Sequence, residues 1–118
     1  MIETADIREW REHDVVDPDG KKIGALESVY VDTATDEPSF ATVRVGVLSR
    51  HRLVFVPLDG ARVGPGYLMV AFPKALVRAA PAIDTDGVLP AEEEPAVFAH
   101  YQMEYVRGAG GERRLARR

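Results

Sequence analysis

Turn signals interrupt the first two-thirds of this chain so often that the apolar segments between them are short. Asp, Gly and Pro recur from residue 17 to residue 66, and several of the intervening segments alternate apolar with polar residues. Such segments are typical of β-strands, because successive side chains of a strand point to opposite faces. The sequence therefore predicts a mainly β fold, a small and strongly bent antiparallel sheet or β-barrel.

A hairpin opens this predicted sheet. Asp17-Pro18-Asp19-Gly20 joins Val15-Val16 to Ile23, and a Pro-Asp-Gly turn between apolar segments predicts a strand on each side. In the segment Lys22–Asp32, the spacing of apolar residues starts near three and ends at two, and Gly24 lies near its start. We therefore expect a strand that bends or bulges.

Three further strands follow along the chain. Residues 41–45 alternate with the period of a half-buried strand, after a polar loop over residues 33–38. Residues 53–58 are apolar on both faces, which predicts the most central strand, covered by the core on one side and by a packed helix or partner on the other. Residues 67–72 alternate again and predict another strand.

Three short helices are expected outside the strands. Asp6 followed by Glu9 resembles a capping box, which predicts a helix over residues 6–12. Residues 73–79 favour a second helix, because a proline suits its first position and good helix formers follow. A third helix is expected over residues 92–101, where three Glu residues precede the apolar positions.

Composition argues against several classes of protein. The chain has 118 residues, no cysteine and a net charge of −4. It therefore lacks the thiols of a disulfide scaffold or a cysteine nucleophile, and its charge argues against coating nucleic acid or an anionic membrane. No apolar run approaches the ~20 residues of a membrane span, and the N-terminus lacks a signal-peptide pattern. We expect an acidic cytoplasmic domain.

Charge is distributed unevenly along the chain. Residues 112–118 carry +3, which leaves −7 for residues 1–111. Gly108-Ala109-Gly110-Gly111 precedes the basic segment and has the composition of a flexible linker. We expect a barrel domain over residues 6–80, a helical extension over residues 81–107 that packs on the barrel or on a second subunit, and a flexible Gly/Arg-rich tail over residues 108–118.

Three motifs in order carry a family resemblance. They are Asp17-Pro18-Asp19-Gly20-Lys21-Lys22-Ile23-Gly24, Glu27-Ser28-Val29-Tyr30-Val31-Asp32 and Arg52-Leu53-Val54-Phe55-Val56-Pro57-Leu58. Their order resembles the PRC-barrel family, named for the cytoplasmic domain of the photosynthetic reaction centre H subunit and shared with a ribosome maturation factor. The segment from Leu89 to Tyr105 resembles an extension of bacterial single-domain members. The resemblance implies a small β-barrel that contacts proteins and has no common catalytic machinery.

Acidic motifs offer few ligands to a metal ion. Asp17 to Gly20 and Asp84 to Gly87 resemble fragments of calcium loops, but neither has the closing Glu of such a loop. We expect Asx-type turns at both positions. Glu92-Glu93-Glu94 raises the same choice between a metal or basic-partner site and acidic residues that favour a helix start, and we expect the helix start.

The sequence contains no recognisable nucleophile-and-base pattern. The histidines are His13, His51 and His100, and none of the three serines lies in a Gly-x-Ser-x-Gly turn. We therefore expect no catalytic residue, no metal and no cofactor. His100 is interpreted as a packing or capping residue near the end of a helix.

One cluster of positive charge lies at the start of the apolar strand. Arg50, His51 and Arg52 are consecutive, so they are candidates for binding a phosphate or an acidic partner. The alternative is a solvated strand end whose charge discourages edge pairing.

Aromatic residues and the basic tail supply the other candidate partner contacts. Trp10 lies on a helix too short to form a core, so it docks on its own barrel or on a second copy. Phe98 and Tyr101 are apolar positions of the extension. Arg113 and Arg114 begin a basic segment that contacts another subunit's acidic surface or only aids solubility, since no aromatic residues are present there to stack on bases.

These observations favour a non-catalytic interaction module that is homodimeric and binds protein rather than nucleic acid. Two alternatives stay open. One is an adaptor in ribosome or RNA maturation, which would use the Arg tail and the Arg50-His51-Arg52 cluster. The other is an accessory protein of an electron-transfer complex, for which fold analogy is the support.

Overall fold

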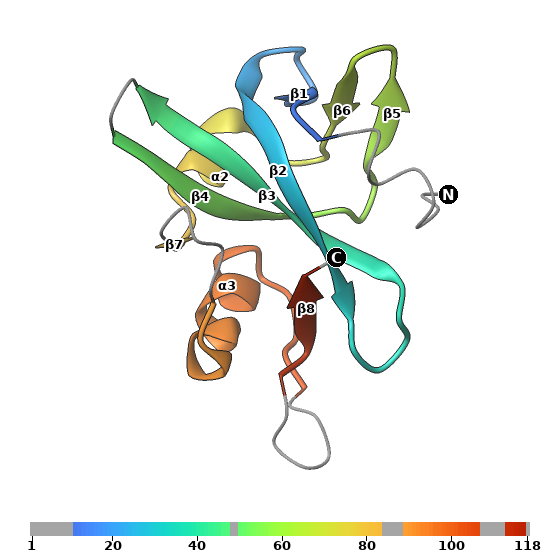
Figure 1. Cartoon of the computed structure of the whole chain (residues 1–118), viewed down its shortest axis with the longest axis vertical. Helices are drawn as coiled ribbons and strands as arrows, with labels where there is room; N and C mark the ends of the chain where they lie inside the picture. The colour runs from blue at the N-terminus through green and yellow to red at the C-terminus, as the bar shows by residue number, and fades with distance from the viewer. Residues whose placement is uncertain (1–10, 48–49, 84–88, 107–112, 118) are drawn as a thin grey trace.

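One mixed sheet of eight strands organises the computed structural model, which describes residues 11–47, 50–83, 89–106 and 113–117 (Figure 1). The strands are β1 (Asp14–Val16), β2 (Lys22–Asp32), β3 (Pro38–Val47), β4 (Arg50–Pro57), β5 (Arg62–Gly64), β6 (Tyr67–Met69), β7 (Ala82–Ile83) and β8 (Leu115–Arg117). Their order is β5-β6-β1-β2-β3-β4-β7, and β8 pairs with β2. Within the described residues, the end strands β5 and β7 do not pair with each other, so the sheet bends without closing.

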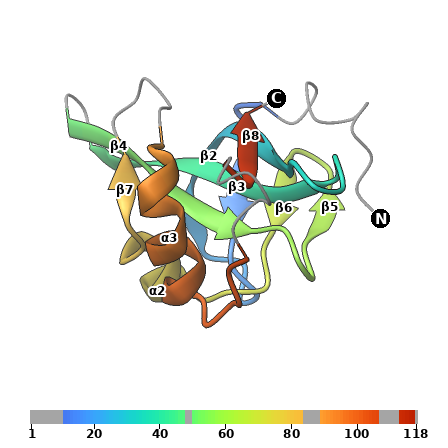
Figure 2. The same ribbon diagram turned by 90° about the horizontal axis from the view of Figure 1, so that it is seen from below.

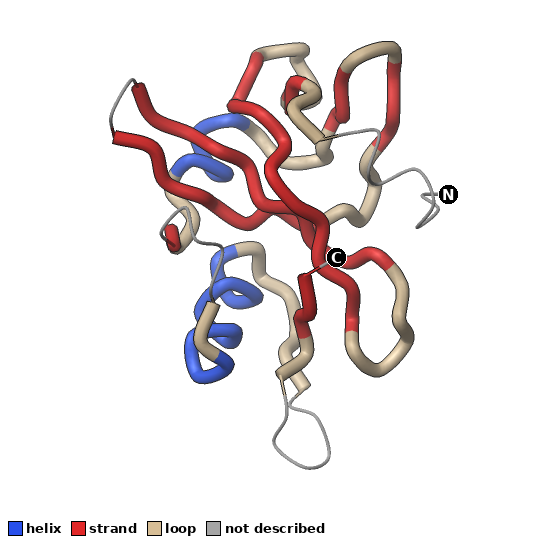
Figure 3. The backbone as a smooth tube through the Cα atoms, viewed as in Figure 1, coloured by secondary structure: helices blue, strands red, loops and turns tan. Residues whose placement is uncertain are grey.

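The mainly β prediction is confirmed, but the sheet is not purely antiparallel. β1 pairs in parallel with β6, in the register Asp14 with Tyr67 and Val15 with Leu68. One edge of β1 pairs with β2. The chain returns through the β5–β6 hairpin, and β6 pairs with the other edge of β1 in the parallel direction. The remaining ladders are antiparallel, and β2, β3 and β4 are the long strands (Figure 3).

The opening hairpin and the bend of β2 are confirmed. The turn ends at Gly20, whose φ of +82° is a conformation that side chains other than glycine rarely adopt. Along β2 the register with β3 shifts twice, as expected for bulges. A Cβ at Gly24 would lie 2.2 Å from the carbonyl oxygen of Arg44. A side chain at residue 24 would therefore collide with the backbone of β3, so glycine is required there.

The apolar strand β4 is buried on both faces but is not central. Leu53 to Leu58 are all buried, which confirms the cover on each side. However, β4 has β3 along one edge and only the two-residue β7 along the other, whereas β2 and β3 lie in the middle of the sheet. The prediction of the most central strand is wrong. The apolar pattern predicts that both faces of β4 are covered. Helices, rather than further strands, provide much of that cover.

Two of the three expected helices are confirmed. α2 (Lys74–Arg78) starts directly after Pro73, and α3 (Glu94–His100) follows a 3-10 turn, η2 (Ala91–Glu93). Figure 2 shows α2 and α3 side by side near β4. The helix expected over residues 6–12 falls largely outside the described residues, and Arg11 and Glu12 lie in a turn. The described helices are all too short to cross a membrane.

Aromatic rings join the sheet to α3. The ring of Phe55 lies 4.9 Å from that of Tyr30 and 6.4 Å from that of Phe40. Phe40 in turn lies 5.0 Å from Phe98 of α3. All four side chains are buried, so the core runs from the middle of the sheet into the C-terminal extension. The described part of the extension therefore packs on the sheet of its own chain.

Candidate functional site

The start of β4 and α2 each carry two cations, and the two elements meet where Arg52 contacts Arg78. Arg50 and Arg52 are exposed, and the Arg52 guanidinium donates a hydrogen bond of 3.1 Å to the carbonyl oxygen of Arg78. Lys74 and Arg78 lie one turn apart on α2. Across the described ranges, no carboxylate forms an ion pair with Arg50, Arg52, Lys74 or Arg78. We call these four residues the basic surface.

A groove of about 290 Å³ adjoins the basic surface. It opens because the pairing of β2 with β3 starts only at Ala25 and Arg44, which leaves the start of β2 and the end of β3 apart. Its lining comprises Lys22, Ile23, Gly24, Ala25, Arg44, Val45, Gly46, Lys74 and Arg78. The lining thus holds four cations and no acidic or aromatic side chain.

Two of the lining cations already have ion-pair partners. Lys22 lies 3.2 Å from Asp14, and Arg44 lies 2.9 Å from Glu12 and 3.5 Å from Glu27. The hydrogen bond and charge of Arg44 lower the pKa of Glu12, and Glu12 in return raises the pKa of Arg44. The unpaired positive charge of the groove therefore comes from α2.

Asp17 fixes α2 against the opening hairpin. Its carboxylate accepts hydrogen bonds from the backbone N–H groups of Asp19 at 3.0 Å, Lys21 at 2.9 Å and Lys74 at 3.2 Å. Burial raises the pKa of Asp17, but these donors outweigh it and hold the pKa below the ordinary value. The expected Asx-type turn is confirmed here, and Asp84 to Gly87 lie outside the described residues.

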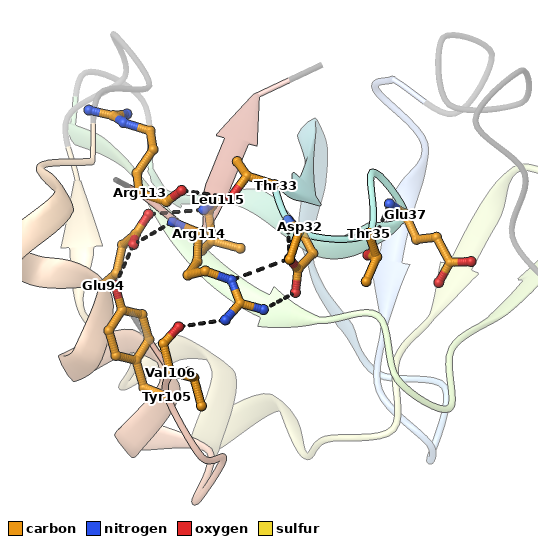
Figure 4. A network of polar contacts seen from close by, with 11 residues as sticks. Asp32, Thr33, Thr35, Glu37, Glu94, Tyr105, Val106, Arg113, Arg114 and Leu115 are labelled. Carbon is orange, nitrogen blue, oxygen red and sulfur yellow. Dashed lines mark hydrogen bonds and ion pairs between the residues drawn. The ribbon is translucent and has the colours of Figure 1, made fainter. Parts of the chain in front are cut away.

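The second polar cluster attaches β8 to the domain (Figure 4). Glu94 is fully buried, and its carboxylate accepts the backbone N–H groups of Arg114 at 2.9 Å and Leu115 at 3.0 Å. The Tyr105 hydroxyl donates to the same carboxylate at 2.7 Å. Glu94 thus anchors β8, whereas Glu92 and Glu93 are exposed. The three consecutive Glu residues did not indicate this role.

Arg114 completes this attachment from the other side. Its guanidinium binds Asp32 through Nη2 at 2.7 Å and Nε at 3.3 Å, and Thr33 donates its hydroxyl to the carbonyl oxygen of Arg113 at 2.7 Å. The Arg113 side chain points away from the cluster (Figure 4). Residues 113–117 therefore belong to the folded domain, in contrast to the flexible tail expected over residues 108–118, because buried acceptors and the edge of β2 hold them.

This cluster predicts a pH-dependent stability. Burial raises the pKa of Asp32, but hydrogen bonds and charge from Arg114 outweigh it, so the pKa lies below its ordinary 3.8. A lowered pKa stabilises the fold above about pH 4 and loses that contribution as pH falls through the folded-state pKa. We expect Asp32→Asn to cost about 1 kcal/mol at pH 7 and less at pH 2, where more of the Asp32 carboxyl group is protonated.

Urea unfolding at both pH values measures this difference. Asp59→Asn, at an exposed turn, is the control and should match the wild type at each pH. An Asp32→Asn cost that is equal at pH 7 and pH 2 would show that the carboxylate charge plays no part.

Phe98 and Tyr101, predicted as partner contacts, lie in the core instead. They are 8% and 6% exposed. The Tyr101 hydroxyl donates to the carbonyl oxygen of Phe55, and burial raises the pKa of this tyrosine. Their helical spacing fits a core face as well as an interface, which is why the sequence did not separate the two. Trp10 lies outside the described residues.

The histidines are distributed rather than clustered. His51 is exposed at the start of β4. His100 Nε2 lies 2.7 Å from the carbonyl oxygen of Leu76, which joins α3 to α2 and fits the expected packing role. In the described ranges, no three His, Asp or Glu side chains come together in a way that suits a metal ion.

Sequence reasoning found two of the four basic-surface residues. Arg50 and Arg52 were visible as neighbours in the chain, whereas Lys74 and Arg78 join them only through the packing of α2 beside β4. The i, i+4 spacing of Lys74 and Arg78 on an expected helix was the available signal, since it places both on one helix face.

Comparison with known families agrees with this architecture. A family model described as PRC-barrel domain matches residues 3–77, which include the opening hairpin, β2 to β6 and most of α2. No curated protein matches the chain at a significant level.

Proposed function

The chain belongs to the PRC-barrel domain family, and on this premise we propose that it is a non-catalytic module that acts by binding another protein. The fold fits such a role, because apolar side chains of one core cluster fill the interior of the sheet and leave loops and edges for binding. A cytoplasmic location is part of the proposal.

One observation carries the proposal: three buried or half-buried acids hold structure, whereas unpaired cations lie at the surface. Asp17, Asp32 and Glu94 each accept hydrogen bonds from the chain itself. Groups engaged in this way are poorly placed to move protons to or from a substrate. The basic surface, by contrast, has no acidic partner among the described side chains and is open to a ligand.

A pull-down from native lysate at low salt, with and without nuclease, tests the binding role. We expect a protein partner that is recovered equally after nuclease treatment and released by moderate salt, because the surface is charged. Recovery that disappears with nuclease would favour the alternative adaptor role in RNA maturation. Recovery of no protein under either condition would contradict the proposal.

We further propose that the module is a homodimer. The outer edge of β7 has no strand partner in the described part of the chain, so a strand edge is available for self-pairing. The apolar strand β4 does not support this idea, since its own chain covers it.

Light scattering measures the oligomeric state directly. We expect a mass near twice the 13.0 kDa of one chain. A mass of one chain at the highest soluble concentration would rule the dimer out and leave the binding role unaffected.

A further inference from the structure

The groove between β2, β3 and α2 continues past the end of the hairpin. A second cavity of about 380 Å³ shares Lys74 and Arg78 with it and adds Lys21, so the two cavities meet at α2. Five cations thus line the combined surface. The second cavity also contains Asp17 and Asp19, and Asp17 is occupied by backbone donors.

The cations of this surface differ in how available they are to a ligand. Lys74 and Arg78 have no carboxylate partner among the described residues. The Lys22 and Asp14 side chains are 62% and 51% exposed, and an exposed pair of this kind is weak and exchanges partners readily. Arg44 stays bound to Glu12 and Glu27. An anionic ligand would therefore find Lys74 and Arg78 of α2 the most available cations, followed by Lys22.

The groove also presents strand backbone. Val45 and Gly46 pair with Arg52 and His51 of β4, but within the described residues they have no strand partner on the β2 side. Backbone groups at an open strand edge bind extended peptides by adding a strand. Cations beside such an edge then select acidic side chains through complementary charge.

Nucleic acid fits this groove less well. Its lining contains no aromatic side chain on which a base could stack. The chain carries a net charge of −4, which repels a long polyanion more than a short acidic segment.

We propose that the groove binds a short, extended, acidic segment of a partner protein, whose carboxylates contact Lys74 and Arg78. This inference rests on the proposed binding role and specifies the chemistry of the partner. A segment with several Glu or Asp residues and no large aromatic side chain fits the lining.

Fluorescence anisotropy with a fluorescein-labelled peptide of eight glutamates tests the proposal on the full chain. We expect saturable binding at low salt that Lys74→Glu weakens about tenfold, because it replaces an attraction with a repulsion. Arg78→Glu repeats the test at a second position and should have a similar effect. Arg62→Glu on the exposed edge strand β5 makes the same change in net charge and should alter the affinity less than twofold.

Three results would overturn the inference. They are no saturable peptide binding, an equal loss with Lys74→Glu and Arg62→Glu, and tighter binding of an eight-nucleotide uridine RNA at the same salt. If the pull-down recovers the same protein with wild type and Lys74→Glu, the groove is not the binding site, although the module still binds protein. The experiments can therefore refute the groove as the binding site without refuting the protein-binding role.

Discussion

Replacing Glu94 with Gln lowers the free energy of unfolding by about 3 kcal/mol and detaches β8 from β2. The carboxylate is fully buried and both of its oxygens accept hydrogen bonds, from the Arg114 and Leu115 backbone and from Tyr105. In Gln, an NH₂ group replaces one of the two carboxylate oxygens. This NH₂ group faces N–H or O–H donors that then lack an acceptor in the protein interior. Urea unfolding measures the loss of stability, and amide exchange at Leu115 to Arg117 measures the detachment.

Glu93→Gln is the matched control for this experiment. Glu93 precedes Glu94 in the chain but is exposed, so the same chemical change should cost less than about 0.5 kcal/mol. If Glu94→Gln proves as stable as Glu93→Gln, or if β8 keeps its protection from exchange, Glu94 is not the anchor of this strand.

Phe55→Ala is expected to cost about 4 kcal/mol, since it removes a fully buried ring and leaves a cavity. Phe55 contacts Tyr30 and Phe40, and through Phe40 the ring cluster reaches Phe98. Its loss therefore loosens the sheet and the C-terminal extension together. Stabilities of most domains lie between about 5 and 15 kcal/mol, so this single change removes a large part of the total.

Thermal and urea unfolding measure this cost, with Val63→Ala as the control. Val63 is 47% exposed on β5, and its truncation should change stability by less than about 0.5 kcal/mol. A Phe55→Ala protein that unfolds at the wild-type urea concentration would contradict the core described above.

Local signals predicted the elements whose causes lie close together in the chain. The turn at Asp17 to Gly20 forms because the Asp17 side chain bonds to N–H groups two and four residues later. α2 follows a proline, and α3 follows a run of acidic residues, so their starts were also marked locally. The family motifs lie in the same stretch of chain, which is why the fold class was predictable.

Contacts between distant segments were not predictable in the same way. The basic composition of residues 113–117 and the Gly-rich segment before them predict a tail, whereas their anchors, Asp32 and Glu94, lie far earlier in the sequence. The apolar pattern of β4 predicts a central strand, but burial on both faces does not reveal whether strands or helices provide the cover. For the basic surface, only the packing of α2 beside β4 brought α2 to Arg52, at the carbonyl oxygen of Arg78.

Binding of a partner protein through the surface beside α2 is the role proposed for this domain. Quantitative recovery of partners in pull-downs with wild type, Lys74→Glu and Arg62→Glu tests that claim most directly. We predict that one protein is recovered equally with wild type and Arg62→Glu and is reduced about tenfold with Lys74→Glu. Equal recovery with all three proteins, or recovery of none with the wild type, would contradict it.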